Sequence, residues 1–467
     1  MIAFFRNFAL HLISIGKPFE QIVTAPYKTY VRTNDRMKAN SNKKTFRKLQ
    51  IIIDNFSVLR IKNIRIYMVG QAISLLGDWM QQTAQAWVVW ELTHKATALG
   101  LVAFLSQIPF FIFGPWVGTF SDRFDRRKIL LITQILAMAF AFILAFLVQI
   151  HQLQVWHIYI LAFLLGTVTA FNTTAEQAFI GDMAGAENIK KAIALNNSLN
   201  QVTRLFGPAI AGWLIASIGV APSFWYNGIS IIVSIYCISI IRSKKEIEKA
   251  KSSGLKEFRV GLAFFHSQKL LRLIILFATV QAFFGGTIVQ LLPAFSTDVL
   301  HGNASTLGAL VGSAGAGALV GIVIVLPFFQ RIKRSCVAIG GAVIWAGLWY
   351  VLFSFARIQP LAMLCQFMAS LGAANVITLS IGLAQELSPP NMRARIVSTF
   401  LMIMLGLQPI ASYLVGKGAD LVGISKMMLV NGTIMVLAST ILMTIPALHR
   451  LKASITPQSL TLPHPIR

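Results

Sequence analysis

Uncharged, apolar runs of about 20 residues recur along this chain of 467 residues, and a helix of about that length spans the hydrocarbon core of a bilayer. Hydrophobic residues make up 56% of the chain and charged residues only 12%, which is more apolar surface than a soluble core can bury. The sequence therefore predicts an all-α membrane protein with twelve transmembrane helices. The expected spans lie at about 66–91, 98–120, 129–150, 156–178, 192–217, 222–241, 271–297, 305–329, 335–356, 359–384, 396–417 and 427–448.

The basic residues gather on one side of these spans. The net charge is +25, from 41 Lys and Arg against 16 Asp and Glu, a balance that would also fit a nucleic-acid-binding protein. With the N-terminus placed in the cytoplasm, however, 36 of the 41 basic residues fall in inner segments, as the positive-inside rule requires. The distribution predicts a multi-pass protein of a bacterial inner membrane with both termini cytoplasmic. Its basic segments are expected to contact anionic lipid, and no nucleic-acid partner is expected.

A charged segment divides the spans six and six. The stretches that lead into spans 5 and 11 echo each other about 200 residues apart, which predicts two six-helix bundles with a site at their interface near the midplane. The basic N-terminal region is expected to be disordered, to form an interfacial helix, or to precede a translation start at Met37. The predicted regions are an N-terminal extension (1–54), an N-terminal bundle (55–241), a cytoplasmic linker (242–270), a C-terminal bundle (271–449) and a cytoplasmic tail (450–467).

Nothing in the sequence indicates cofactor or metal chemistry. The three cysteines, Cys237, Cys336 and Cys365, lie in or beside apolar runs without metal-ligand or disulfide spacing. The glycine-rich stretch 308–321 follows no predicted strand, so its small residues indicate close helix packing rather than a dinucleotide loop. No Walker A sequence or nucleophile elbow occurs. We therefore expect a protein that is not an enzyme, binds no cofactor or metal, and takes no energy from ATP hydrolysis unless a second chain supplies an ATPase.

Asp78 is a carboxylate about twelve residues into the first span, near the bilayer midplane. A charge at that depth costs about 2.5–3.5 kcal/mol. Its helix face also carries Gln71, Ser74, Gln82 and Gln85, and such a polar stripe is expected to line a substrate cavity. Because burial favours the neutral form of a carboxyl group, Asp78 is predicted to take up and release a proton. A purely structural aspartate that bonds to a neighbouring helix is the alternative.

Arg204 lies at a similar depth in the fifth span and is the expected partner of Asp78. Asn197 and Asn200 share its helix face and are assigned to the substrate cavity. Two hypotheses remain open for the pair. Arg204 could bind Asp78 in one state and an anionic substrate in another, or the two could form a permanent buried ion pair that only holds the bundle together.

A dense group of charges, GTFSDRFDRRKIL (118–130), separates the second and third apolar runs. It resembles the signature between spans 2 and 3 of the major facilitator superfamily, Gly-x-Leu-x-Asp-Arg-x-Gly-Arg-Lys, with Phe120 and Asp125 as departures. The resemblance implies a cytoplasmic gate that latches the two bundles together. Its aspartate would cap a neighbouring helix start, such as span 11, and its arginines would pair with rim acids such as Asp182 or Glu386. The gate residues are Gly118, Asp122, Arg123, Arg126 and Arg127.

Other segments, among them SLLGDWMQ, TAFNTTAEQAF and GPAIAG, narrow the resemblance to the exporter branch typified by the enterobactin exporter. This branch includes transmembrane secretion effectors and macrolide-efflux relatives. Gly207, Pro208 and Gly212 look like the span 5 signature of antiporters in the superfamily, where they form a seam that allows close helix approach. Glu176 is a departure, since relatives usually carry a basic residue there.

The resemblance implies a monomeric, proton-coupled secondary transporter that exports a small amphiphilic molecule, with a siderophore as the first expectation. The sequence leaves three alternatives open. They are a macrolide or multidrug efflux antiporter, a siderophore importer of the same fold, and a non-transporting partner protein.

Overall fold

The chain is helical throughout its described part. The computed structural model describes residues 57–241, 264, 268–329, 335–389 and 392–445, and for 114–123, 393–395 and a few single positions it gives the backbone alone. The predicted N-terminal extension and C-terminal tail, and nearly all of the predicted linker, lie outside these residues. We call the helices up to Ile240 the N-terminal half and the helices from Lys269 onward the C-terminal half.

The N-terminal half contains five long helices, one of which has two arms. The helix α8 is 64 residues long, but Gly185 inside it has the non-helical angles φ 69° and ψ 165°. Glycine has no Cβ and therefore adopts a positive φ without strain, so the chain bends there and the two arms cover the fourth and fifth expected spans. The helices are α5 (Lys62–Thr93), α6 (Ala96–Arg123), α7 (Arg126–Gln149), α8 (Val155–Ile218) and α9 (Ala221–Ile240), after a short 3-10 turn η1 (Ser57–Arg60).

The C-terminal half is less regular in its first two spans, which contain short π-helical turns. Such turns insert an extra residue into a helix and locally disturb its hydrogen bonds. The first span is built from α11 (Lys269–Val280), η2 (Gln281–Gly285), η3 (Ile288–Leu291), α12 (Leu292–Ala294) and η4 (Phe295–Val299). The others are α13 (Ala304–Val320) with η5 (Gly321–Val325) and α14 (Leu326–Phe329), then α15 (Ser335–Phe355), α16 (Gln359–Glu386), α17 (Arg393–Val422) and α18 (Ile424–Met443).

Among the described residues, 10 helices are long and apolar enough to cross a membrane. The helix α5 and the second arm of α8 are not among these ten. In α5 the polar stripe around Asp78 lowers the hydropathy of an otherwise suitable helix. The structure therefore supports a multi-pass helical protein, while the total of twelve spans and the cytoplasmic location of both termini stay predictions.

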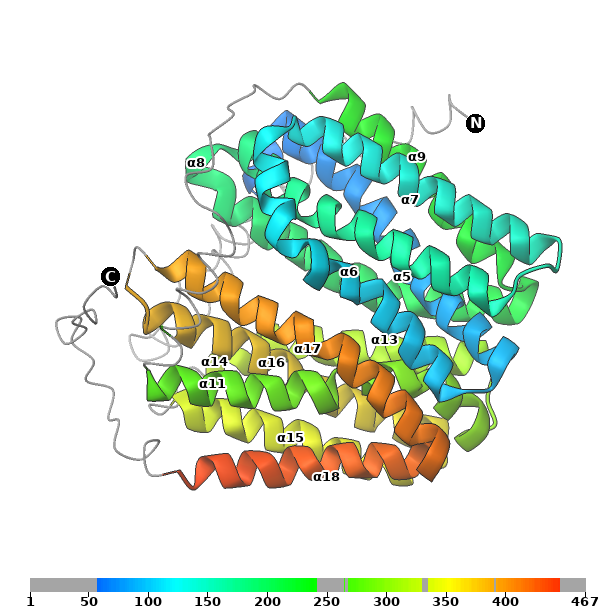
Figure 1. Ribbon diagram of the computed structural model, residues 1–467, viewed down its shortest axis with the longest axis vertical. Coiled ribbons are helices and arrows are strands. Elements are labelled where there is room, and N and C mark those ends of the chain that lie inside the picture. The colour runs from blue at the N-terminus through cyan, green and yellow to red at the C-terminus, as the bar shows by residue number, and fades with distance from the viewer. Residues whose placement is uncertain (1–56, 242–263, 265–267, 330–334, 390–391, 446–467) are drawn as a thin grey trace, which may run out of the picture. The chain divides into compact units, whose positions relative to one another are not determined.

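The two halves meet along two helix pairs, α6 with α17 and α8 with α13 (Figure 1). In the second pair the backbones nearly touch, because a Cβ built on Gly212 would lie 2.5 Å from the carbonyl oxygen of Ala304. A Cβ on Gly308 would lie 2.5 Å from the carbonyl oxygen of Pro208. Gly207 instead faces α5, where its Cβ would meet Trp79 at 2.6 Å. The seam predicted in span 5 thus packs on two sides, and its role in motion remains a proposal.

We expect the close helix contacts to depend on glycine in a position-specific way. A Cβ on Gly317 would lie 2.1 Å from the carbonyl oxygen of Phe367, whereas a Cβ on Gly341 meets nothing within 4 Å. Gly317→Ala should therefore lower the melting temperature of the detergent-purified protein. Gly341→Ala, the matched control, should leave it unchanged or raise it, because alanine favours a helix over glycine by about 1 kcal/mol. Equal melting temperatures for the two variants would contradict this packing.

Candidate proton-coupling site

Glu176 is held by neutral hydrogen-bond donors from two helical segments, α5 and the second arm of α8. It lies on the first arm of α8, and its Oε1 accepts from Gln71 Nε2 of α5 at 3.0 Å. The same oxygen accepts from Asn196 Nδ2, on the second arm of α8, at 2.9 Å. The Tyr67 hydroxyl of α5 also hydrogen-bonds to Glu176. This carboxylate therefore links α5 to both arms of α8 inside the N-terminal half.

Asp78 lies in the same half and faces α9. It is hydrogen-bonded by Asn227, whose Nδ2 also donates to Gln81 Oε1 at 2.9 Å. The helices α5 and α9 come close here because Gly77 has no side chain, and a Cβ at this position would lie 2.5 Å from Asn227 Oδ1. Asp78 is also near enough to Glu176 for the two carboxylates to interact electrostatically. Two acidic groups thus share the interior of one bundle.

Arg204 lies on the second arm of α8 and faces a side of α5 other than the one that carries Asp78. Its guanidinium carbon lies 5.3 Å from the ring centroid of Trp79, a geometry in which cation and ring attract each other. Tyr350 of α15, in the C-terminal half, is close enough to interact with it electrostatically. Successive residues on a helix point about 100° apart. Trp79 and Asp78 are neighbours in α5, so they face different side chains: Trp79 faces Arg204 and Asp78 faces Asn227. Within the described residues, the expected Asp78–Arg204 ion pair is not formed.

The other predicted cavity residues are divided between the interior and the surface. Gln71, Ser74 and Gln85 are buried, Asn200 is half-buried, and Gln82 and Asn197 are exposed. Asn196, the residue before the predicted Asn197, contacts the Glu176 carboxylate. The structure therefore brings Gln71 into the acidic cluster and leaves the placement of a substrate at the remaining positions a proposal.

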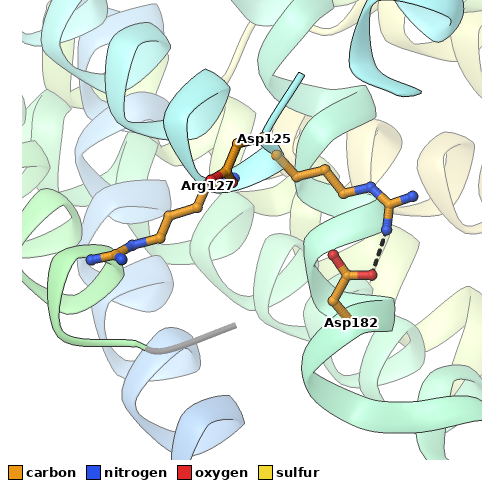
Figure 2. A network of polar contacts seen from close by, with 4 residues as sticks. Asp125, Arg127 and Asp182 are labelled. Carbon is orange, nitrogen blue, oxygen red and sulfur yellow. Dashed lines mark hydrogen bonds and ion pairs between the residues drawn. The ribbon is translucent and has the colours of Figure 1, made fainter. Parts of the chain in front are cut away.

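Residues 125–127 of the basic motif organise the end of the N-terminal half. Asp125, a departure from the superfamily signature, is the N-cap of α7, and its carboxylate accepts from the backbone N–H of Arg127 at 3.0 Å. The Arg127 side chain donates to the carbonyl oxygens of Ile238, at 3.1 Å from Nε, and of Ser239. It thereby caps the last turn of α9, where cations are favoured by the helix dipole. In Figure 2 the Arg127 side chain extends away from Asp182.

Arg126 forms an ion pair with Asp182 of α8, one of the two rim acids expected as partners (Figure 2). Both side chains are about one-fifth exposed, at 22% and 21%. The pair joins α7 to α8, so it lies within the N-terminal half and does not latch the two halves together as expected. Only the backbone is described for Gly118, Asp122 and Arg123, so their predicted part in the gate stays a prediction.

Tyr67, Glu176 and Asn196 were not assigned to the site from the sequence. Glu176 is a departure from the exporter branch in sequence, and an acidic residue inside a predicted span is itself a signal of function. Tyr67 precedes Gln71 by four positions and so extends the polar stripe of α5 by one turn. No cluster of three or more His, Cys, Asp or Glu residues that could hold a metal ion occurs in the described part of the chain.

A comparison with protein families matches residues 53–466 to the family described as Transmembrane secretion effector. The chain belongs to the transmembrane secretion effector family. This is a transporter family of the major facilitator type rather than a family of enzymes.

Proteins similar to this chain include named efflux proteins and transporters. Macrolide efflux protein A of Streptococcus pyogenes is 24% identical over 375 residues, which cover 79% of this chain and 92% of that protein. The multidrug efflux pump Tap of Mycobacterium bovis is 23% identical and covers 80% of this chain and 91% of its own length. The staphyloferrin A transporter of Staphylococcus aureus is 24% identical over 54% of this chain and 64% of its own length.

Solved structures share the fold of the secretion effector at low sequence identity. A bacterial homologue of the human lysosomal transporter Spinster superimposes with a TM-score of 0.66 at 13% identity, covering 82% of this chain and 96% of that chain. The D-xylose-proton symporter has a TM-score of 0.64 at 14% identity, covering 81% and 97%. These likenesses establish the major facilitator fold and carry no information on cargo.

The hydrogen bonds around Glu176 predict a difference between two substitutions. Glu176→Gln keeps an acceptor oxygen for Gln71 and Asn196, so stability should stay near that of the wild type. Glu176→Ala leaves both amides without their partner and should lower the unfolding free energy by about 1–3 kcal/mol. Thermal unfolding of the purified variants checks this, with exposed Glu187→Ala as control. If the Ala and Gln variants melt together, these bonds do not stabilise the half.

Proposed function

We propose that this chain is a proton-driven exporter that moves a small amphiphilic molecule from the cytoplasm across a bacterial inner membrane. One observation carries the proposal. Asp78 and Glu176, both half-buried, lie within the N-terminal half, and the hydrogen-bond partners described for both are neutral side chains. An acidic group inside a membrane protein is costly and typically marks a proton or substrate pathway. Without a cationic partner, such a group can be discharged only by taking up a proton.

The hydrogen bonds of Glu176 suggest how its charge would act on the rest of the molecule. The ionised carboxylate holds Gln71 of α5 and Asn196 of the second arm of α8. A proton on the carboxylate weakens these charge-assisted bonds. The second arm also packs backbone to backbone against α13 through Gly212 and Gly308. Protonation would therefore loosen the helical arm that meets the other half, and so bias the equilibrium between inward-open and outward-open states.

Asp78 serves as a second proton site in this proposal. Its nearness to Glu176 disfavours the state in which both groups are ionised. Arg204, held over Trp79 and close to Tyr350, is proposed to meet the substrate at the interface between the halves rather than to neutralise Asp78. Gly118, Asp122 and Arg123 are proposed to form the inner gate toward α17. Arg126 and Arg127 would position that gate through α8 and α9.

A siderophore is the proposed cargo, because a relative is named staphyloferrin A transporter. Arg204, which forms no ion pair with Asp78, also suits a carboxylate-bearing molecule. Macrolide or multidrug efflux is the second candidate, favoured by the greater coverage of the relatives with those names. The exporter is proposed to act as a monomer with both termini cytoplasmic. Its basic residues would then face anionic lipid. Siderophore uptake by the same fold is the alternative, and the direction of flux distinguishes it from export.

Flux in proteoliposomes tests the proton site. Purified protein should move staphyloferrin A or a macrolide when a pH gradient is applied, with proton movement followed by an internal pH dye. Asp78→Asn and Glu176→Gln should reduce gradient-driven flux to the level of empty liposomes, because a carboxamide cannot carry a proton. Exchange of cargo without a gradient should persist. Glu91→Gln, an exposed acid on the same helix as Asp78, is the matched control and should transport normally.

Two results would contradict the proposal. Undiminished gradient-driven flux in both carboxamide variants would remove the proton role of this cluster. Absence of all flux with either cargo, together with unchanged metabolites inside and outside cells that lack the gene under iron limitation, would favour a non-transporting partner protein. Iron-chelating compounds retained inside such cells would support siderophore export.

A further inference from the structure

Asp420 joins the two halves at one end of the helix pair α6 and α17. It lies in the last turn of α17, and its Oδ1 accepts from the backbone N–H of Ala96 at 2.7 Å. Its Oδ2 accepts from the backbone N–H of Thr97 at 2.9 Å and from the Thr97 hydroxyl. Ala96 is the first residue of α6, so one carboxylate of the C-terminal half caps a helix of the N-terminal half.

The position of this carboxylate is unfavourable for its own helix. An acidic side chain in the last turn of a helix opposes the negative end of the helix dipole, whereas at a helix start it is favoured. The first N–H groups of α6 point to Asp420, since Lys95 precedes them and offers no acceptor side chain. Asp420 therefore contributes to a contact between the halves rather than to α17.

In the other helix pair, α8 with α13, the start of α13 is capped by a residue of its own half. Asn303 lies directly before α13 and accepts from the backbone N–H groups of Ser305, at 3.0 Å, and Thr306, at 3.3 Å. This cap is internal to the C-terminal half, so it is kept whatever the halves do. The cap of α6 is kept only while the two halves stay together at this end.

The surroundings of Asp420 are built for close approach. A Cβ on Gly416 would lie 2.5 Å from the carbonyl oxygen of Ala96, and a Cβ on Gly100 would lie 2.3 Å from that of Ser412. A second polar contact joins the halves at this end, because Trp90 Nε1 donates to Thr297 Oγ1 at 2.7 Å. Trp90 is in the last turn of α5, which ends three residues before α6 begins.

We propose that Asp420 is a gating residue that holds this end of the transporter closed, and that its three hydrogen bonds are broken when the end opens. With the termini cytoplasmic, as proposed above, the end faces the outside and the contact stabilises the inward-open state. The assignment of outer and inner rests on the proposed function, but the gating role does not. Because Asp420 is exposed, water can replace the cap when the halves part.

Distances between spin labels at this end test the gate. Labels on Lys95→Cys, before α6, and Lys426→Cys, in α18, report the separation of the two halves, and both positions are exposed. The three native cysteines are buried. Variants with only one introduced cysteine serve as controls, because any distance signal from them comes from labelled native cysteines. Asp420→Ala should raise the ratio of long-distance to short-distance populations about five-fold, the shift produced by loss of one helix cap. Asp420→Asn, which keeps a carbonyl acceptor, should raise the ratio less.

Two further variants separate gating from folding. Thr97→Val removes one of the three bonds and keeps the shape of the side chain, so it should raise the same ratio by a smaller factor and still fold. Asn303→Ala removes the cap of α13 within one half and should leave the ratio unchanged. An unchanged ratio in Asp420→Ala, Asp420→Asn and Thr97→Val alike would overturn the proposal. The readout needs neither cargo nor a proton gradient, so its failure is distinct from a failure of the proposed transport.

Discussion

A carboxylate inside a membrane bundle needs donors for its oxygens, and this constraint shapes the N-terminal half. Glu176 accepts hydrogen bonds from Gln71 and Tyr67 of α5 and from Asn196 of α8. Asp78 accepts a hydrogen bond from Asn227 of α9. Four helical segments are therefore tied together through two acidic side chains whose described partners are neutral. Such a network is stable while its donors and acceptors match and rearranges when a proton changes one acceptor into a donor.

The contacts between the halves are of a different kind. Along α8 and α13 the backbones approach through glycines, and along α6 and α17 glycines are joined by the cap from Asp420. Small residues at these seams let the helix backbones approach closely and pack in van der Waals contact. The second arm of α8 belongs to both systems, since it carries Asn196 on one side and Gly212 on another. In the proposed mechanism, a change of charge at Glu176 reaches the seam through this arm.

The helical fold, the polar stripe of α5 and an acid as partner of Arg126 were all predictable from the sequence, because periodicity and charge placement are local signals. The partners that depend on how helices face each other were not. Arg204 was expected at Asp78 from matching depth, yet it lies over the adjacent Trp79, since neighbouring helix positions point in different directions. Likewise Asn196, which is not among the predicted cavity residues, donates to Glu176, and Asp125, an apparent departure from the signature, caps α7.

The central claim is that Asp78 and Glu176 carry the proton, and infrared difference spectroscopy of the purified protein tests it most directly. Lowering the pH should produce the carbonyl stretching band of a protonated carboxyl group in the wild type. A double variant, Asp78→Asn with Glu176→Gln, should lack the part of that band due to these residues, while Glu91→Gln should keep it. Identical spectra from the wild type and the double variant over the whole pH range would contradict the account, because neither carboxylate would then exchange a proton.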